Sequence, residues 1–492
     1  MRFVWPSSRP LGLPLLLAGM LTTLGFAPFF LWPLALLGVA VLYRAVLAAR
    51  GPRQAFVAAL VWGIGHQLTA LYWLPRAFYL DADRSVEAAV AGGVPALLGL
   101  GLYGAVAYAL VAAGARAAPM RWRAAAFVGL WVAVEVLKSL HPMGFPWLPL
   151  GAVWGGSLPL MQSASIWGVH GLSLLVLAVA LLLSRLQPWR WRTAAAVLLV
   201  LYTGGLARLA VAPATADGST IRLVQPNIQS AHKWDARLRL EYLRQTLDVA
   251  YAPGRQDVQA IFMPETAVAF YLQEEDAVRG MVASGLVPGQ SLVTGTVRRQ
   301  TDTIPPRYYN SMVSMNAAGH FDGWYDKKLL VPFGEYIPFR KLIDALPLPA
   351  PVRVMSQSRL DYAFGTYDPH LPTAVGTGLA LICYEGIFPY HVAKHAAGAD
   401  YLINVTNDNW FTGTTALAQH ATLERLRAVE TGLPLVRVAN TGITMVVDGY
   451  GRITASLPIN TATLADVPLP PKLESTPWRQ AVSRLYGFLH KT

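Results

Sequence analysis

The sequence predicts a protein of two parts, a membrane domain of packed helices followed by a layered α/β domain. Only 14% of the residues are charged and the mean hydropathy is +0.38, unlike a typical soluble protein. The apolar residues are concentrated in the first 212 positions, whereas strand-like and helix-like segments alternate beyond residue 219. With 492 residues, the chain is also too long for one ordinary domain.

Seven apolar segments in the first part are long enough to cross a bilayer. A spanning helix needs about 20 residues, or about 17 at the short end. The expected spans are 11–27, 29–49, 55–75, 87–115, 124–140, 157–184 and 193–212. Residues 1–212 are therefore expected to form a membrane domain of about seven transmembrane helices.

Basic residues between these segments predict the orientation of the membrane domain. The loops of one side carry most of the arginines, and such an excess marks the cytoplasmic side. The N-terminus is therefore expected in the cytoplasm. Seven spans then place everything after residue 212 on the opposite face, which is the periplasm of a Gram-negative cell.

Several polar side chains lie in or beside the expected spans, and ionisable groups there are functional candidates by default. They are His66, Gln67, Glu135, Lys138, His170 and Arg208. Glu135 and Lys138 are three residues apart on one helix, so we expect them to pair with each other. The segment 141–147, rich in proline and aromatic residues, suits an irregular stretch at the outer membrane interface.

The second part contains the only cysteine of the chain, Cys383. It follows the apolar run 378–382, which is typical of a buried strand, and Gly386 and Pro389 indicate a turn after it. A thiol held at a strand end can act as a nucleophile, although a lone cysteine is often only a small core residue. A single cysteine excludes an intramolecular disulfide and a cysteine-based zinc site.

Two charged residues at other strand ends favour the interpretation of Cys383 as a nucleophile over that of a core residue. Glu265 ends the apolar stretch 260–264 and could accept the thiol proton. Lys327 precedes another apolar run, and an ammonium group can lower a thiol pKa and stabilise an oxyanion. Taken singly, each is more often a solvated charge. His420, on a predicted helix, offers a Cys–His pair as an alternative, although a histidine on a helix is more often structural.

The chain order Glu265, Lys327, Cys383 resembles the nitrilase, or carbon–nitrogen hydrolase, superfamily over roughly residues 219–470. Together with the spans, the whole chain resembles its membrane-bound branch, the apolipoprotein N-acyltransferase family. The motifs that carry the resemblance are Gly25-Phe-Ala-Pro28, Gly144-Phe-Pro-Trp147, Met263-Pro-Glu265, Leu330-Val-Pro-Phe-Gly-Glu335, Cys383-Tyr-Glu385, Asn407-Asp408 and Asn440-Thr-Gly442. Leu330–Glu335 is the most specific, since the bare order of the three residues would fit any nitrilase.

The resemblance implies an α-β-β-α sandwich over residues 219–470 and a catalytic triad of Glu265, Lys327 and Cys383. Alignment on Leu330 favours Lys327 over its neighbour Lys328. The supporting or substrate-binding residues implied by the same matching are Glu335, Tyr384, Glu385, Trp234, Asn407 and Trp410.

The resemblance also implies the reaction. A fatty acyl chain would pass from a phospholipid donor, through a thioester on the cysteine, to the N-terminal α-amine of a diacylglyceryl lipoprotein acceptor at the bacterial inner membrane. No cofactor or metal is expected. One alternative is a membrane-tethered nitrilase or amidase acting on a small amide; another is a transporter with an inactive domain, against which the intact triad argues. Despite a net charge of +12, the arginines lie between apolar segments, which argues against nucleic-acid binding.

Two features depart from the family pattern. The tail, residues 471–492, is too short and too charged to add a span. Leu485, Phe488 and Leu489 would share one helix face, so we expect an interfacial helix there. The turn at 412–414 replaces one that begins with glycine, which leaves its local geometry open.

Overall fold

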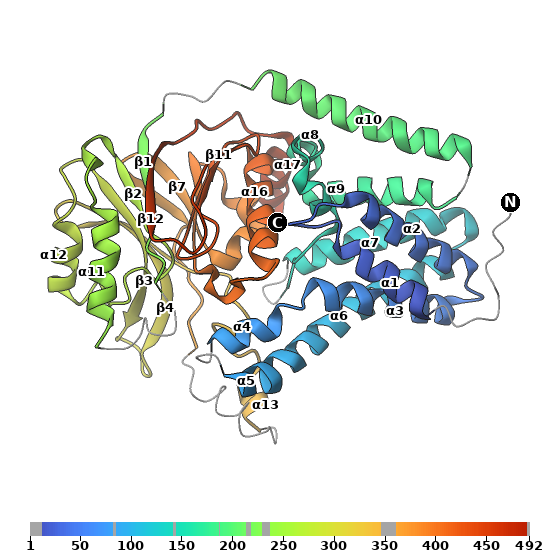
Figure 1. Ribbon diagram of the computed structural model, residues 1–492, viewed down its shortest axis with the longest axis horizontal. Coiled ribbons are helices and arrows are strands. Elements are labelled where there is room, and N and C mark those ends of the chain that lie inside the picture. Colours follow the sequence, from blue (N-terminus) through green and yellow to red (C-terminus); the bar gives the residue numbers. More distant parts are fainter. Residues whose placement is uncertain are drawn as a thin grey trace.

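The computed structural model describes residues 12–81, 85–140, 144–185, 187–212, 218–228, 237–345 and 361–489. The first 212 residues form a bundle of helices, and the remainder forms an α/β domain beside it (Figure 1). The long helices of the bundle are α1 (Gly12–Thr23), α2 (Trp32–Ala48), α3 (Pro52–Ala70), α6 (Val94–Ala117), α7 (Arg123–Leu140), α9 (Ala164–Leu183) and α10 (Pro188–Ala210). Shorter pieces connect them: α4 (Leu74–Asp81), α5 (Val86–Ala88), η1 (Ala89–Gly93), η2 (Met120–Trp122), η3 (Leu150–Gly156) and α8 (Leu158–Met161).

Four helical segments among the described residues are long and apolar enough to cross a membrane. They are Pro52–Leu80, Ala89–Ala117, Ala164–Leu183 and Pro188–Ala210. Their outer faces expose large apolar side chains, as expected where lipid is the solvent, for example Val57, Leu98, Leu102, Leu199 and Val200. The chain is therefore a multi-span membrane protein. The helices α1 and α2 are also apolar but shorter, and the count of seven spans stays a prediction.

The predicted pair of Glu135 and Lys138 does not form. Glu135 Oε1 accepts hydrogen bonds from the indole of Trp131 at 2.9 Å and from the backbone N–H of Leu150 at 2.8 Å. No ion pair joins Glu135 and Lys138 within the part of the chain that the structure describes. The pairing was wrong because the start of η3 presents a free N–H to the same carboxylate, and a buried N–H must be satisfied.

The second half of the chain is a sandwich of two sheets. Within the described ranges, twelve strands form two six-stranded mixed sheets. The first has the order β12-β1-β2-β3-β4-β5, formed by Thr463–Pro468, Thr220–Gln225, Ala260–Phe262, Ser291–Gln300, Arg307–Asn316 and Phe321–Asp326. The second has the order β11-β10-β9-β8-β7-β6, formed by Ile453–Ser456, Met445–Val447, Leu435–Ala439, Tyr401–Thr406, Gly376–Ile382 and His370–Thr373.

The two sheets pack face to face over a common apolar core. Phe262 and Met312 from the first sheet meet Ile382, Ile403 and Val436 from the second, and all five are fully buried. Helices α11 (Arg239–Ala250) and α12 (Asp276–Ala283) cover the outer face of the first sheet, and α15 (Pro389–His395) and α16 (Ala416–Thr431) cover that of the second (Figure 1). This arrangement is the predicted α-β-β-α sandwich.

Helix α16 lies between the second sheet and the membrane helices. Leu423, Leu426 and Val429 of this helix belong to the same apolar cluster as the core of the helical bundle. Polar contacts cross the boundary as well, since the backbone N–H of Val169 in α9 donates to Glu430 of α16 at 2.7 Å. The membrane bundle and the sandwich therefore share one layer, which fixes the second sheet against the bundle.

The tail forms helix α17 (Pro477–Leu489), and its first turn is anchored. The Trp478 ring packs 5.5 Å from the ring of Tyr390 in α15, and Arg479 donates to the backbone carbonyl of Ala396. Further along, Leu485 and Phe488 are exposed. The tail is thus helical, as expected, and lies beside the sandwich; its contact with a membrane surface stays a prediction.

The packing of α17 predicts which side of the membrane the C-terminus occupies. In a Cys383→Ser background, a cysteine appended after Thr492 should react with a membrane-impermeant thiol reagent on intact cells or spheroplasts just as Asp276→Cys on α12 does. Arg50→Cys, in the basic loop after α2, should react only after the membrane is permeabilised. A C-terminal cysteine that behaves like Arg50→Cys would mean that the tail crosses the membrane.

Candidate active site

The three predicted catalytic side chains stand at the ends of strands from both sheets. Glu265 comes three residues after β2, Lys327 directly after β5 and Cys383 directly after β7. Lys327 Nζ lies 3.8 Å from Glu265 Oε1, and both charges act on the Cys383 thiol. The face-to-face packing of the sheets thus brings together residues that lie far apart in the sequence.

A tight turn holds Cys383. The residue has φ of +49°, a conformation that non-glycine residues rarely adopt, and it opens the short helix η6 (Cys383–Ile387). Its carbonyl accepts a hydrogen bond from Asn404 Nδ2 at 3.0 Å. A Cβ on Gly386 would lie 2.7 Å from the Glu424 side chain, so glycine is needed for the turn to pack on α16. Cys383 is therefore positioned by backbone strain and close packing.

The environment of Cys383 keeps its thiol protonated. Burial raises the pKa of the Cys383 thiol well above its ordinary value, and the Glu265 carboxylate raises it further, while Lys327 opposes both. A thiol with such a pKa is almost entirely neutral near pH 7. Attack on a carbonyl therefore requires a neighbouring base to take the proton as the reaction proceeds.

Glu265 is held as a hydrogen-bond acceptor at two points. Asn310 Nδ2 donates to Oε1 at 2.7 Å, and the backbone N–H of Asn407 donates to Oε2 at 2.8 Å. A Cβ on Gly295 of β3 would lie 2.4 Å from the backbone nitrogen of Thr266, so the strand below the turn must carry glycine. These contacts fix the carboxylate beside Lys327.

Lys327, and not Lys328, faces Glu265. Its side chain is 1% exposed, and Nζ donates to Glu335 Oε1 at 3.0 Å. Burial alone would lower the pKa of the Lys327 ammonium group, but Glu335, Glu265 and Cys383 together raise it above the ordinary value, so the group stays charged. Lys328 is only partly buried and offers its backbone N–H to Glu385 at 2.7 Å.

The two predicted supporting carboxylates do different things. Glu335 receives hydrogen bonds from Lys327, from Asn310 Nδ2 at 2.8 Å and from the backbone N–H of Val331 at 2.8 Å. It therefore balances the charge of Lys327. Glu385 is fully buried and accepts its hydrogen bonds from groups other than the Lys327 ammonium.

Glu385 ties β5 to β7. One of its oxygens accepts from the Tyr325 hydroxyl and from the Lys328 backbone N–H, each at 2.7 Å, and the other accepts from the Ile382 backbone N–H at 2.8 Å. Tyr325 lies two residues before Lys327 and Lys328 directly after it, and Ile382 precedes Cys383. The carboxylate therefore positions the strand ends that carry Lys327 and Cys383.

Tyr384 connects the nucleophile to the membrane half. Its hydroxyl donates to the carbonyl of Gly144 at 2.7 Å, and its ring stacks on Phe145 with centroids 6.3 Å apart and planes inclined by 20°. Both partners belong to the segment that follows α7. The residue next to Cys383 thus packs on the aromatic segment that the sequence predicted for the outer interface.

The remaining predicted residues differ in how close they lie to the triad. Asn407 contacts Glu265 through its backbone. Trp410 is half-buried on η7 (Asp408–Phe411), and it is the neighbouring Phe411 whose ring contacts Trp73 of the membrane half, with centroids 5.0 Å apart. Trp234 lies outside the described residues. The sequence did not predict the geometry of the turn at 412–414. In the structure, Arg76 Nε donates a hydrogen bond to the carbonyl of Thr412 in this turn at 2.7 Å.

Sequence reasoning missed two parts of the site. Asn310, in β4, donates hydrogen bonds to both Glu265 and Glu335. The only sign of this role in the sequence was a polar residue within a predicted strand. Behind the cysteine turn lies a buried ionic cluster of Asp408, His420, Glu424 and Arg437. The i, i+4 spacing of His420 and Glu424 was its signal.

The same cluster argues against a Cys–His pair. His420 lies 3.2 Å from Asp408 and 2.8 Å from Glu424 through its two ring nitrogens. Burial alone would lower the pKa of His420, but Glu424 and Asp408 raise it to about 9, so the ring is charged near neutral pH and cannot accept a proton. Among the described residues, no cluster of three or more histidine, cysteine or acidic side chains could hold a metal ion.

Both halves of the chain match known protein families. Residues 18–182 match the apolipoprotein N-acyltransferase N-terminal domain, and residues 220–477 match the carbon-nitrogen hydrolase family. Apolipoprotein N-acyltransferase of Allorhizobium ampelinum is 36% identical over 84% of this chain and 79% of its own length. That of Brucella melitensis is 35% identical over 92% of this chain and 88% of its own length.

Among solved structures, an amidase from Nesterenkonia sp. aligns with 57% of this chain and 99% of its own, at 19% identity and a TM-score of 0.39. The two family matches and the full-length relatives cover both the helical bundle and the sandwich. By these matches, the chain belongs to the apolipoprotein N-acyltransferase family, a membrane-bound group within the carbon–nitrogen hydrolase superfamily.

Proposed function

We propose that this protein transfers a fatty acyl chain from a phospholipid to the N-terminal α-amine of a diacylglyceryl-cysteine lipoprotein, the final step of lipoprotein maturation. One observation carries the proposal: a protonated, buried thiol stands beside a hydrogen-bonded carboxylate and a charged lysine, and its neighbour Tyr384 packs on the membrane half. Family membership supports the same reaction.

The first half-reaction loads the enzyme. Glu265 takes the proton of Cys383 as the sulfur attacks the ester carbonyl of the phospholipid. The negative charge that develops on the carbonyl oxygen is stabilised by the Lys327 ammonium and by the backbone N–H of Tyr384. The carbon–oxygen bond of the ester then breaks, and the leaving alkoxide takes the proton from Glu265. A lysophospholipid departs and a thioester remains on Cys383.

The second half-reaction transfers the acyl chain. The neutral α-amine of the lipoprotein attacks the thioester carbonyl, and Glu265 accepts a proton from the nitrogen. The same two donors stabilise the second oxyanion. When the carbon–sulfur bond breaks, the thiolate recovers a proton from Glu265, and the amide product leaves. A buried site favours this amine over water, since exclusion of water protects the thioester.

The proposal includes a location. The excess of basic residues in the loops on one side of the bundle supports an inner-membrane protein whose sandwich faces the periplasm, where lipoproteins carry their diacylglyceryl group. Hydrolysis of a small amide by a membrane-tethered amidase is the rival. The contact of Tyr384 with Phe145 favours a lipid substrate, because it places the nucleophile next to the membrane segment.

Cys383→Ser should abolish transfer, because a serine hydroxyl has too high a pKa to replace the thiol as nucleophile at this site. Intact-mass analysis of the wild-type protein incubated with phospholipid should show one added acyl group, and the mutant should show none. Unchanged thermal stability of the mutant is the control for folding. Full N-acylation of a lipoprotein by the mutant would refute the triad.

Lys327→Ala should slow acylation of Cys383 by about 10²–10³-fold, the usual cost of removing one oxyanion donor. Lys328→Ala is the matched control, because its side chain lies away from Glu265 and should leave the rate nearly unchanged. The measurement is the rate of thioester formation by mass spectrometry. Equal losses, or a larger loss for Lys328→Ala, would mean that the oxyanion is stabilised elsewhere.

A further inference from the structure

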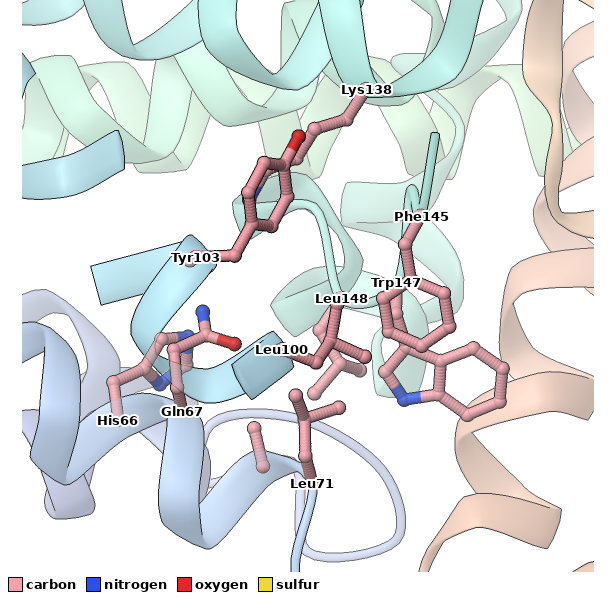
Figure 2. Close-up of a pocket in the computed structure, with 11 residues that line it drawn as sticks. His66, Gln67, Leu71, Leu100, Tyr103, Lys138, Phe145, Trp147 and Leu148 are labelled. Carbon is pink, nitrogen blue, oxygen red and sulfur yellow. The ribbon is translucent and has the colours of Figure 1, made fainter. Parts of the chain in front are cut away.

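A pocket opens between the membrane helices next to the active site (Figure 2). Helix α3 contributes His66 and Gln67, and Leu71 follows its end; α6 contributes Leu100 and Tyr103, and α7 contributes Lys138. The last wall is the segment after α7, with Phe145, Trp147 and Leu148. The polar side chains of the lining come from three helices, α3, α6 and α7, and the other side chains are apolar or aromatic.

Lys138 brings a basic group to this pocket, and among the described residues no acidic side chain forms an ion pair with it, although Glu135 acts on it through space. Its Nζ lies 5.6 Å from the ring centre of Tyr103 and 5.4 Å from that of Tyr108. Glu135, the carboxylate one helical turn away, is engaged by Trp131 and Leu150, and no ion pair to Lys138 occurs among the described residues. A lysine inside a membrane bundle is costly, and it favours an anion nearby.

The pocket is adjacent both to lipid and to the nucleophile. Tyr103 is 54% exposed on the outer face of α6, beside the exposed Leu98 and Leu102, so one wall borders the lipid-facing surface. The opposite wall carries Phe145, whose ring stacks on Tyr384, the residue after Cys383. Lys138 lies two residues before the end of α7, shortly before the segment whose Gly144 and Phe145 contact Tyr384.

We propose that this pocket, with Lys138 as its charged group, binds the phosphate of the phospholipid donor and so presents the donor's ester to Cys383. The ligand must combine an anion with apolar surface, because the lysine stands among leucine and aromatic side chains. A phospholipid has that chemistry. The acceptor's diacylglyceryl group carries no phosphate, so the site serves only the first half-reaction. This inference rests on the proposed function.

The test compares two acyl donors that differ in the phosphate. Phosphatidylethanolamine and diacylglycerol carry the same glycerol esters, but only the first carries an anion. Lys138→Met keeps the length and apolar stem of the side chain and removes the charge. It should slow acylation of Cys383 by phosphatidylethanolamine by about tenfold to a hundredfold, the range expected for a lost charge-assisted hydrogen bond, and leave acylation by diacylglycerol unchanged.

Three controls keep the result interpretable. Lys138→Arg should retain most of the phospholipid rate, because the positive charge remains. Transfer from a preformed acyl-enzyme to a lipoprotein peptide should be unaffected by Lys138→Met. Arg208→Met removes a cation from α10, outside the pocket, and should leave the ratio of the two donor rates as in the wild type.

Several outcomes would overturn the proposal. Equal losses with both donors would make Lys138 structural, and no loss would leave it only a partner of the two tyrosine rings. Inhibition of the wild-type reaction by inorganic phosphate that is lost in Lys138→Met, while the phosphatidylethanolamine rate of this variant is unchanged, would show a site for free phosphate instead. If neither donor acylates Cys383 in the wild-type protein, it is the proposed acyl transfer that fails.

Discussion

The active site depends on the hydrogen bonds that the buried carboxylate of Glu385 accepts. It joins the strand that ends in Lys327 to the strand that ends in Cys383, through the Tyr325 hydroxyl and backbone N–H groups on both sides. The two strands belong to different sheets, so apolar packing alone would allow them to slide. A carboxylate with several donors in fixed positions removes that freedom, and it does so where solvent cannot compete for the hydrogen bonds.

The second constraint is the layer shared by the bundle and the sandwich. Here α16 is buried on both sides, by the sheet and by the membrane helices (Figure 1). The buried cluster of Asp408, His420, Glu424 and Arg437 lies between this helix and the second sheet, so charged groups are satisfied by one another where water has no access.

Much of this architecture could be predicted from the sequence, for identifiable reasons. Hydropathy located the membrane half, and the Glu–Lys–Cys order with Leu330–Glu335 located the sandwich and the residues that the structure brings together. Lys327 was separated from Lys328 by a motif alone. Asn310 was not foreseen, because nothing in a strand pattern shows which polar residue meets a carboxylate across the fold. Glu135 and Lys138 illustrate the same limit, since helical spacing shows which residues can meet but not which competing donor lies nearby.

The high pKa of the Cys383 thiol has a consequence beyond the reaction. Oxidants and electrophiles attack thiolates rather than thiols, so a cysteine held neutral is poorly reactive toward peroxides and disulfides. The chain has no second cysteine with which to form an internal disulfide. In the proposed reaction the thiolate forms only when a carbonyl is in place and a carboxylate takes the proton, so Cys383 is protected from chemical damage between turnovers.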